Sequence, residues 1–111
     1  MTVRGDVVVV STLAGELLAE ARENPAGRAA RTVVSGTSQR ATVIALIAGA
    51  ELSEHQAPAA ATIQVIAGQV WLYTAAREWR LTEGDLVAVP PERHGVRAED
   101  DAAVLLTVAL R

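Results

Sequence analysis

Short strand-like segments separated by turn residues occupy most of this chain, from residue 31 onward. Glycine or proline recurs between these segments, at Gly36, Gly49, Pro58, Gly68, Gly84, Pro90 and Pro91. The segments are rich in β-branched or alternating apolar residues, and they span 31–35, 41–47, 62–66, 70–74, 79–81, 86–89 and 103–110. No long helical segment separates the later strands, which disfavours a parallel sheet with crossover helices. Short strands at this spacing predict an all-β sandwich or barrel.

Two of these segments indicate how their strands are buried. Segment 41–47 is almost continuously apolar, as expected for a strand that is covered on both faces. Segment 62–66 alternates instead, so Ile63 and Val65 are expected to face the core while Gln64 faces away.

The residues before the strands predict one helix. Ser11 or Thr12 is the expected N-cap, and the run Asn24-Pro25-Ala26-Gly27 is expected to end the helix. One face is apolar, through Leu13, Leu17, Leu18 and Ala21. Because that face needs a partner surface, we expect the helix to pack on the barrel or on a partner subunit. The chain then divides into an N-terminal segment, 1–28, and a β-barrel, 29–111.

Composition limits the compartment and the partners. The chain has 111 residues, of which 50% are hydrophobic, so it suits a single domain with a small core that would gain from pairing as a homodimer. The net charge is −3 and no basic run occurs, so nucleic acid is not an expected partner. The apolar run 7–10 is too short for a signal sequence or a membrane span. Cysteine is absent, which excludes disulfides and thiolate sites, and we expect a cytoplasmic protein with no membrane partner.

Two stretches of the chain resemble the paired motifs of the cupin superfamily. The first family motif is a glycine, five residues, His-x-His, three or four residues, a glutamate, six residues and a glycine. Gly49, His55 and Gly68 match it, whereas Ala57 takes the place of the second histidine and Ala61 that of the glutamate.

The second motif is glycine, five residues, proline, one residue, glycine, two residues and histidine. Gly84 and Pro90 match it, Glu92 replaces the second glycine, and His94 arrives one residue early. The resemblance extends from about residue 29 to the end of the chain. It implies an all-β fold, a cupin-type double-stranded β-helix (jelly-roll) barrel with a short N-terminal helix.

The resemblance also implies four metal-ligand positions, of which only His55 and His94 hold a residue that can bind a metal. Alanines at positions 57 and 61 cannot ligate, so the cofactor is either absent or a divalent metal held by the two histidines. His94 shares its alternation with Val96 and Ala98, so we expect it to point into the barrel. None of Gln64, Glu51, Glu54 and Glu92 is expected at a position that replaces the missing carboxylate.

Three functions follow from these expectations, and the sequence leaves open whether the protein is an enzyme. The first is a small-molecule-binding or regulatory barrel whose organic ligand is oriented by His55 and His94. The second is a metal-dependent oxygenase or isomerase that uses the same two histidines. The third is a structural or interaction protein without a ligand.

The aromatic residues and several arginines are further candidates for ligand contact. Trp71, Tyr73 and Trp79 are interpreted as packing or dimer-surface residues in preference to a ligand-stacking set. Arginines near the barrel mouth could meet an anion, but solvated surface positions are the favoured interpretation for Arg77, Arg80, Arg93 and Arg97.

Overall fold

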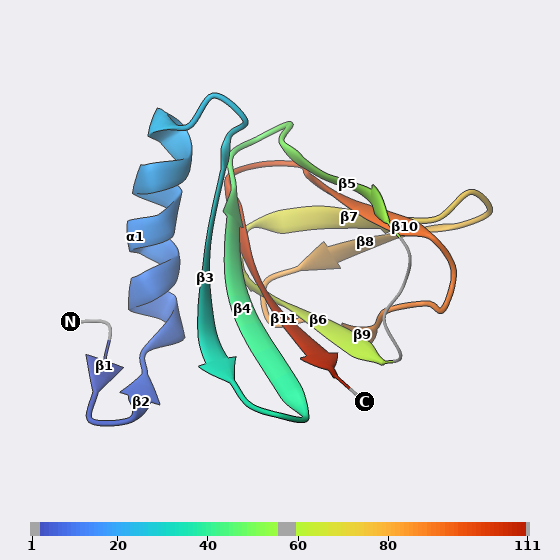
Figure 1. Cartoon of the computed structure of the whole chain (residues 1–111). Coiled ribbons are helices and arrows are strands. Elements are labelled where there is room, and N and C mark those ends of the chain that lie inside the picture. Colours follow the sequence, from blue (N-terminus) through green and yellow to red (C-terminus); the bar gives the residue numbers. More distant parts are fainter. Residues whose placement is uncertain (1–2, 56–59, 111) are drawn as a thin grey trace.

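Two antiparallel sheets face each other in the computed structural model, which describes residues 3–55 and 60–110, with the backbone alone for residues 54 and 55 (Figure 1). The larger sheet has the order β3 (Arg28–Ser35), β4 (Gln39–Leu46), β11 (Ala102–Ala109), β6 (Ala61–Ala67) and β9 (Leu86–Ala88). The smaller sheet has the order β5 (Glu51–His55), β10 (His94–Ala98), β7 (Gln69–Tyr73) and β8 (Glu78–Thr82). The predicted all-β fold is confirmed.

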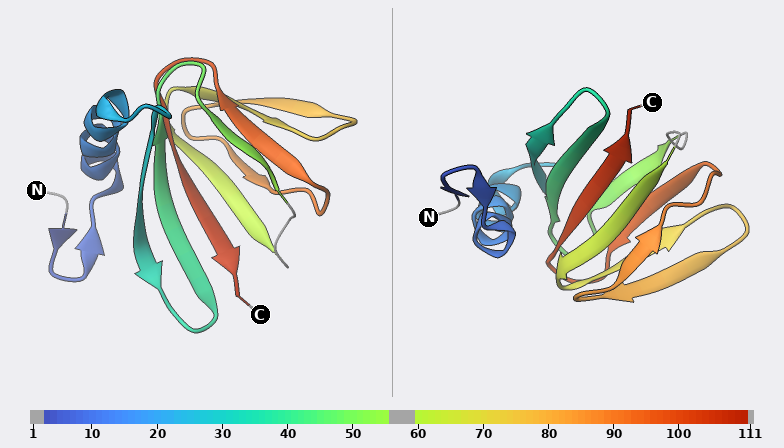
Figure 2. Two further views of the ribbon diagram at one scale, coloured as in Figure 1. Left: turned by 45° about the horizontal axis from the view of Figure 1, so that its top comes forward. Right: turned by 90° about the horizontal axis from the view of Figure 1, so that it is seen from below.

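A short hairpin and one helix precede the sheets. The hairpin pairs β1 (Val3–Arg4) with β2 (Val7–Val8), two strands that add to the predicted set. The helix is α1 (Val10–Glu23), and both views of Figure 2 place it on one side of the five-stranded sheet with the four-stranded sheet on the other. No helix in the described ranges is long and apolar enough to cross a membrane.

The main core lies between the two sheets. Its buried members come from both layers: Ile44, Leu46, Ile63, Val65, Val70, Leu72, Leu81, Val96, Ala98, Ala102 and Val104. Ile63 and Val65 face this core and Gln64 is exposed, as their alternation predicts. Each fully buried Val or Leu side chain contributes about 1.5–3 kcal/mol relative to an exposed one.

A second core lies between α1 and the other face of the five-stranded sheet. Leu13, Leu17 and Ala21 from the helix meet Val43 and Ala45 from β4. Because Ile44 and Leu46 of the same strand enter the main core, β4 is buried on both faces, as its continuous apolar sequence predicts.

The helix starts earlier than the sequence suggests. Ser11 and Thr12 are exposed within the first turn, so the expectation that one of them is the N-cap is wrong. Val9 is the N-cap and offers no side-chain hydrogen bond. Val8 and Val10 pack against the second core. A cap is worth about 1 kcal/mol, less than burial of a valine, so packing decides where the helix begins. The helix ends at Glu23 with Asn24 as its C-cap, so the run that begins at Asn24 ends the helix as predicted.

The loop between β10 and β11 joins the helix to both sheets. The Asp101 carboxylate accepts the backbone N–H of Ala48 at 3.0 Å and pairs with Arg22 of α1 at 3.0 Å. The Ala48 hydrogen bond, followed by Arg22, holds the pKa of Asp101 below its usual value. The chain approaches Gly68 closely here: a Cβ on Gly68 would lie 2.8 Å from the Ala102 Cα, and its φ of +75° also requires glycine.

Candidate functional site

His94 begins β10 and points into the barrel. Its side chain is 3% exposed and shares its burial with Val96 and Ala98, as the sequence alternation predicts. The ring Nδ1 lies 3.0 Å from the carbonyl oxygen of Glu92. A carbonyl oxygen can only accept, so Nδ1 is the donor in this contact.

The backbone brings the second motif histidine opposite the first. In the β5–β10 register, Val96 pairs with Leu52 and His94 pairs with His55. Three steps along β5 therefore match two steps along β10, which defines a β-bulge with one extra residue in β5. Directly opposed residues of antiparallel strands have Cα atoms about 4.5–5.5 Å apart. The register thus joins the two positions, while the role of the His55 side chain stays a prediction.

The other two ligand positions of the resemblance offer nothing to a metal. Ala57 lies outside the described residues. Ala61 begins β6 on the same side of the strand as Ile63 and Val65, and its methyl group cannot ligate. In the part of the chain that the structure describes, no group of three or more His, Cys, Asp or Glu side chains is placed to hold a metal ion. The donor set therefore does not fit the metal centre that the resemblance implies.

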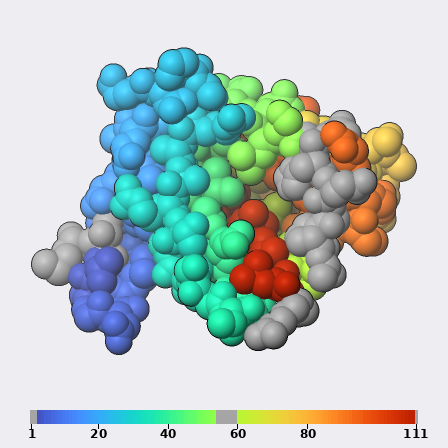
Figure 3. All heavy atoms as spheres, in the orientation of Figure 1, coloured from blue at the N-terminus to red at the C-terminus, as the bar shows by residue number. Residues whose placement is uncertain are grey.

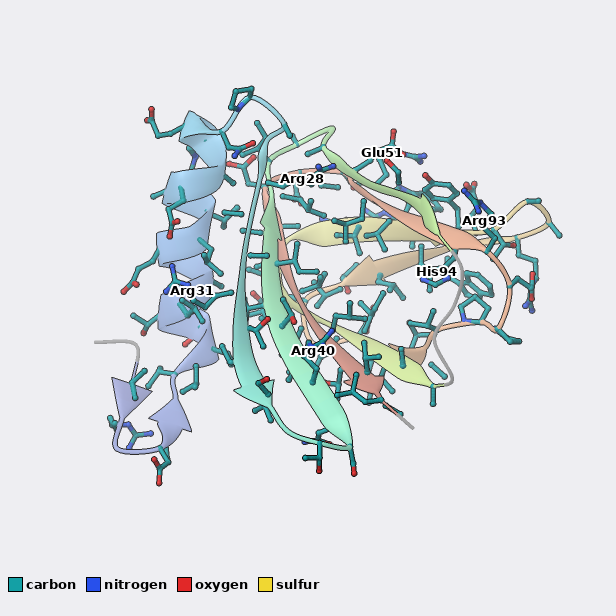
Figure 4. The ribbon with its side chains drawn as sticks, viewed as in Figure 1. Arg28, Arg31, Arg40, Glu51, Arg93 and His94 are labelled. Atoms are coloured by element: carbon teal, nitrogen blue, oxygen red, sulfur yellow. The ribbon has the colours of Figure 1, made fainter. Side chains whose placement is uncertain are left out.

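The acidic residues near these positions are engaged elsewhere. Glu92 forms an ion pair with Arg77 at 3.1 Å, and Glu51 accepts the hydroxyl of Tyr73 at 2.8 Å. In Figure 4 Glu51 points away from the space between the sheets. Both carboxylates thus have partners of their own, and the expectation that neither replaces the missing ligand stays a prediction.

An opening leads to the inner face between the two edge strands β3 and β5. Arg28 of β3 donates to the carbonyl oxygen of Glu51 on β5 at 2.7 Å and so bridges the two sheets. Beside it lies a pocket of about 290 Å³, lined in part by Ala30, Ile44 and Leu52. Ile44 and Leu52 also contact the main core, so the pocket reaches the inner face. Figure 3 shows this side of the molecule hollowed between the teal residues of β3 and β4 and the green residues of β5.

Arg40 is a candidate site residue that the sequence analysis does not find. It lies on β4 at the same parity as Ile44 and Leu46, so it belongs to the inner face of the sheet. The register aligns it with Val108 on β11, and Val108 is aligned in turn with Ala61 on β6. In Figure 4 its side chain leaves β4 toward the four-stranded sheet, and His94 lies across from it. The signal in the sequence that could have identified Arg40 is its even spacing from Ile44, which places both side chains on the same face of a strand.

The outer face of the four-stranded sheet carries a network of paired side chains. Trp71 donates its indole N–H to Glu99 at 3.0 Å, and Arg80 pairs with the same carboxylate at 2.7 Å. This contact with Arg80 is the main cause that lowers the pKa of Glu99. Arg97 lies 5.9 Å from the centre of the Tyr73 ring. Trp71 and Tyr73 thus pack within a surface network, as interpreted from the sequence.

Trp79 belongs to the other side of that sheet. It packs against the main core, and Arg77 lies 4.7 Å above its ring centre. Its partner across the strands is the buried Leu72. The packing role expected for Trp79 is therefore the one that the structure shows.

Comparison with solved structures supports the fold. A conserved protein of unknown function from Streptococcus pyogenes shares 24% identity over 78% of this chain and 76% of its own, with a TM-score of 0.70. An RmlC-like cupin from Shewanella frigidimarina shares 22% identity over 78% of each chain, also with a TM-score of 0.70. A cupin superfamily protein from Desulfitobacterium hafniense shares 12% identity over 76% of this chain and 78% of its own, with a TM-score of 0.71. These similarities confirm the cupin fold.

Comparison with protein families identifies a family in addition to the fold. Curated protein sequences give no significant match. The family model described as the AraC-like ligand binding domain matches residues 42–110, a range that begins within β4, extends past the end of β11 and contains both motif histidines. With this match over more than half of its length, the chain belongs to the AraC-like ligand binding domain family, and its fold is that of the cupins.

Proposed function

We propose that this chain binds a small organic molecule in the space between its two sheets, beside His94. The observation that carries the proposal is a buried imidazole held by a backbone carbonyl at the start of an inner-face strand. A buried polar side chain that is held in this way has a defined orientation, as a group that positions a ligand requires. The membership in a ligand-binding domain family supports the same function.

The surroundings of His94 suit an organic ligand. Partly buried apolar side chains border the main core, among them Leu52, Val87, Val89 and Leu106. Apolar walls with a few directed polar groups are typical of small-molecule sites. In this proposal His94 orients the ligand by a hydrogen bond, and His55 contributes from the opposed position of β5. A metal-dependent reaction is not proposed, since the described residues supply no suitable donor set.

The test is binding of a fragment panel to the ¹⁵N-labelled protein, followed by NMR. We expect fragments of the right class to shift the amide signals of Gly95 and Val96, and His94→Gln to weaken that binding by about tenfold or more. Gln64→Ala, on the exposed outer face of β6, is the matched control and should bind as the wild type does. Equal binding by wild type and His94→Gln would contradict the proposed role of His94.

We further propose that the chain forms a homodimer. In this proposal residues 1–28 are an N-terminal segment that packs on the barrel, 29–111, or on the partner subunit. The support is exposed apolar side chains: Val3 and Val7 of the N-terminal hairpin are 46% and 52% exposed, and Val34 near the end of β3 is 42% exposed. Val3 borders a pocket that also includes Thr32 and Val33 of the edge strand β3, so this apolar surface is next to an edge. Sedimentation at micromolar concentration tests the proposal, and a monomer alone would overturn it.

A further inference from the structure

Arg40 occupies a particular place on the inner face. Arg40, Val108 and Ala61 form one row across three neighbouring strands. Directly opposed residues in antiparallel strands point to the same face, so all three share the side of Leu106 and Ile63, which contact the main core. Strands lie about 4.8 Å apart, which puts Arg40 and Ala61 two strand spacings, or about 10 Å, from each other.

In the described part of the chain, Arg40 lacks the ion pair that four other arginines form. Arg22, Arg31, Arg77 and Arg80 each form an ion pair. Arg40 is exposed, and within the described residues no carboxylate forms an ion pair or a hydrogen bond with it. Its guanidinium is thus accessible at the rim of the inner face without an internal counterion there.

The side chains around Arg40 do not supply a negative charge. Its neighbours in the row are valine and alanine, and the next inner-face row toward the core contains Thr42, Leu106 and Ile63. Thr42 is 3.4 Å from the hydroxyl of Thr32. A guanidinium beside apolar side chains attracts an anion more strongly than one in bulk water, because the local dielectric constant is lower.

We propose that the ligand of this barrel is a small organic carboxylate whose charged group pairs with Arg40. This inference rests on the proposed function and names its ligand class. The planar guanidinium offers two parallel N–H donors that match the two oxygens of a carboxylate. The apolar body of the ligand lies over the partly buried Val108 and Leu106, toward His94. With alanine at position 61, the site offers a cation to an anionic ligand and has no carboxylate there for a metal.

The net charge of the chain is negative, so any attraction for an anion has to come from particular side chains. The formal net charge is −3, so the protein as a whole does not concentrate anions. Preference for an anionic probe must therefore arise at a particular place, and a single substitution should remove it.

The experiment compares two acids with their neutral amides: benzoate with benzamide, and hexanoate with hexanamide. Each probe is titrated into the ¹⁵N-labelled full chain at fixed ionic strength, and the Arg40 side-chain Nε–H and the Gly95 amide signals are followed. Arg40→Gln is the test variant. Arg31→Gln changes the charge equally on the opposite face of the sheet, where Arg31 pairs with Glu20 of α1 at 3.2 Å, and is the control.

We expect the acids to bind at least about tenfold more tightly than the amides, with the difference lost in Arg40→Gln and kept in Arg31→Gln. If amides and acids bind equally and Arg40→Gln has no effect, the anionic ligand class is wrong and the proposed binding function remains. If no probe shifts any inner-face signal of the wild type, both proposals are overturned.

Discussion

Arginine has acidic partners on the outer face of the four-stranded sheet, whereas Arg40 on the inner face of the five-stranded sheet has none in the described chain. On the outer face, Arg80 and Trp71 converge on Glu99, and Arg97 lies over Tyr73. On the inner face, Arg40 lies beside Val108, with no acidic side chain among the described neighbours in its row. Paired surface charges contribute little binding capacity because their hydrogen bonds are already used. The difference indicates that the outer network supports the structure, whereas the inner face is available to a ligand.

Among the variants considered, Gly95→Ala on the outer face should cause the largest loss of stability. Gly95 is opposite Tyr73, and a Cβ at Gly95 would overlap the Tyr73 ring. We expect a loss of about 1–3 kcal/mol in the free energy of unfolding, as for other overpacked sites. Urea unfolding measures it. The same substitution in a Tyr73→Ala background is the control, because the smaller neighbour should remove most of the cost; an equal loss in both backgrounds would refute the collision.

The Asp101 carboxylate should make stability depend on pH. Its pKa is lowered in the folded state, first by the Ala48 N–H and then by Arg22, so folding favours the ionised form. Its contribution is therefore complete above the unfolded value of 3.8 and is lost as pH falls through the lower folded pKa. Thermal unfolding from pH 6 down to about pH 2 should show a smaller decrease in Asp101→Asn than in the wild type. An identical pH dependence in both proteins would contradict this assignment.

Arg40→Gln should have the smallest effect on stability, and its comparison with Arg80→Gln tests whether the inner-face arginine has a structural role. Because Arg40 is exposed and has no ion pair in the described chain, we expect a change within about 0.5 kcal/mol. Arg80→Gln should lower the melting temperature more, since it removes the partner of Glu99. Differential scanning calorimetry of the two variants tests the ranking, and the reverse order would mean that Arg40 has a structural role.

The elements that the sequence predicts are those with a local signal. The continuous apolar run of β4 and the alternation of β6 specify how these strands are buried, because side-chain period and burial are linked. The start of α1 depends instead on packing of Val8 and Val10, which no local pattern reveals. In the candidate site, the burial of His94 follows from alternation, whereas Arg40 depends on pairing between strands far apart in sequence. The opposition of His55 and His94 also needs the β5 bulge, which shifts the alternation within the strand.

That bulge means that strand register, as well as residue identity, selects the chemistry at the mouth of the barrel. One extra residue between Leu52 and His55 makes position 55 the partner of His94. Without the bulge, a regular ladder continued from the Leu52–Val96 pair would bring position 54, a glutamate in this sequence, opposite His94. A shift of one residue in the register of this short stretch would therefore exchange an imidazole position for a carboxylate position without any substitution. Changes of register in an edge strand are thus a route by which a barrel of this kind can acquire a different ligand.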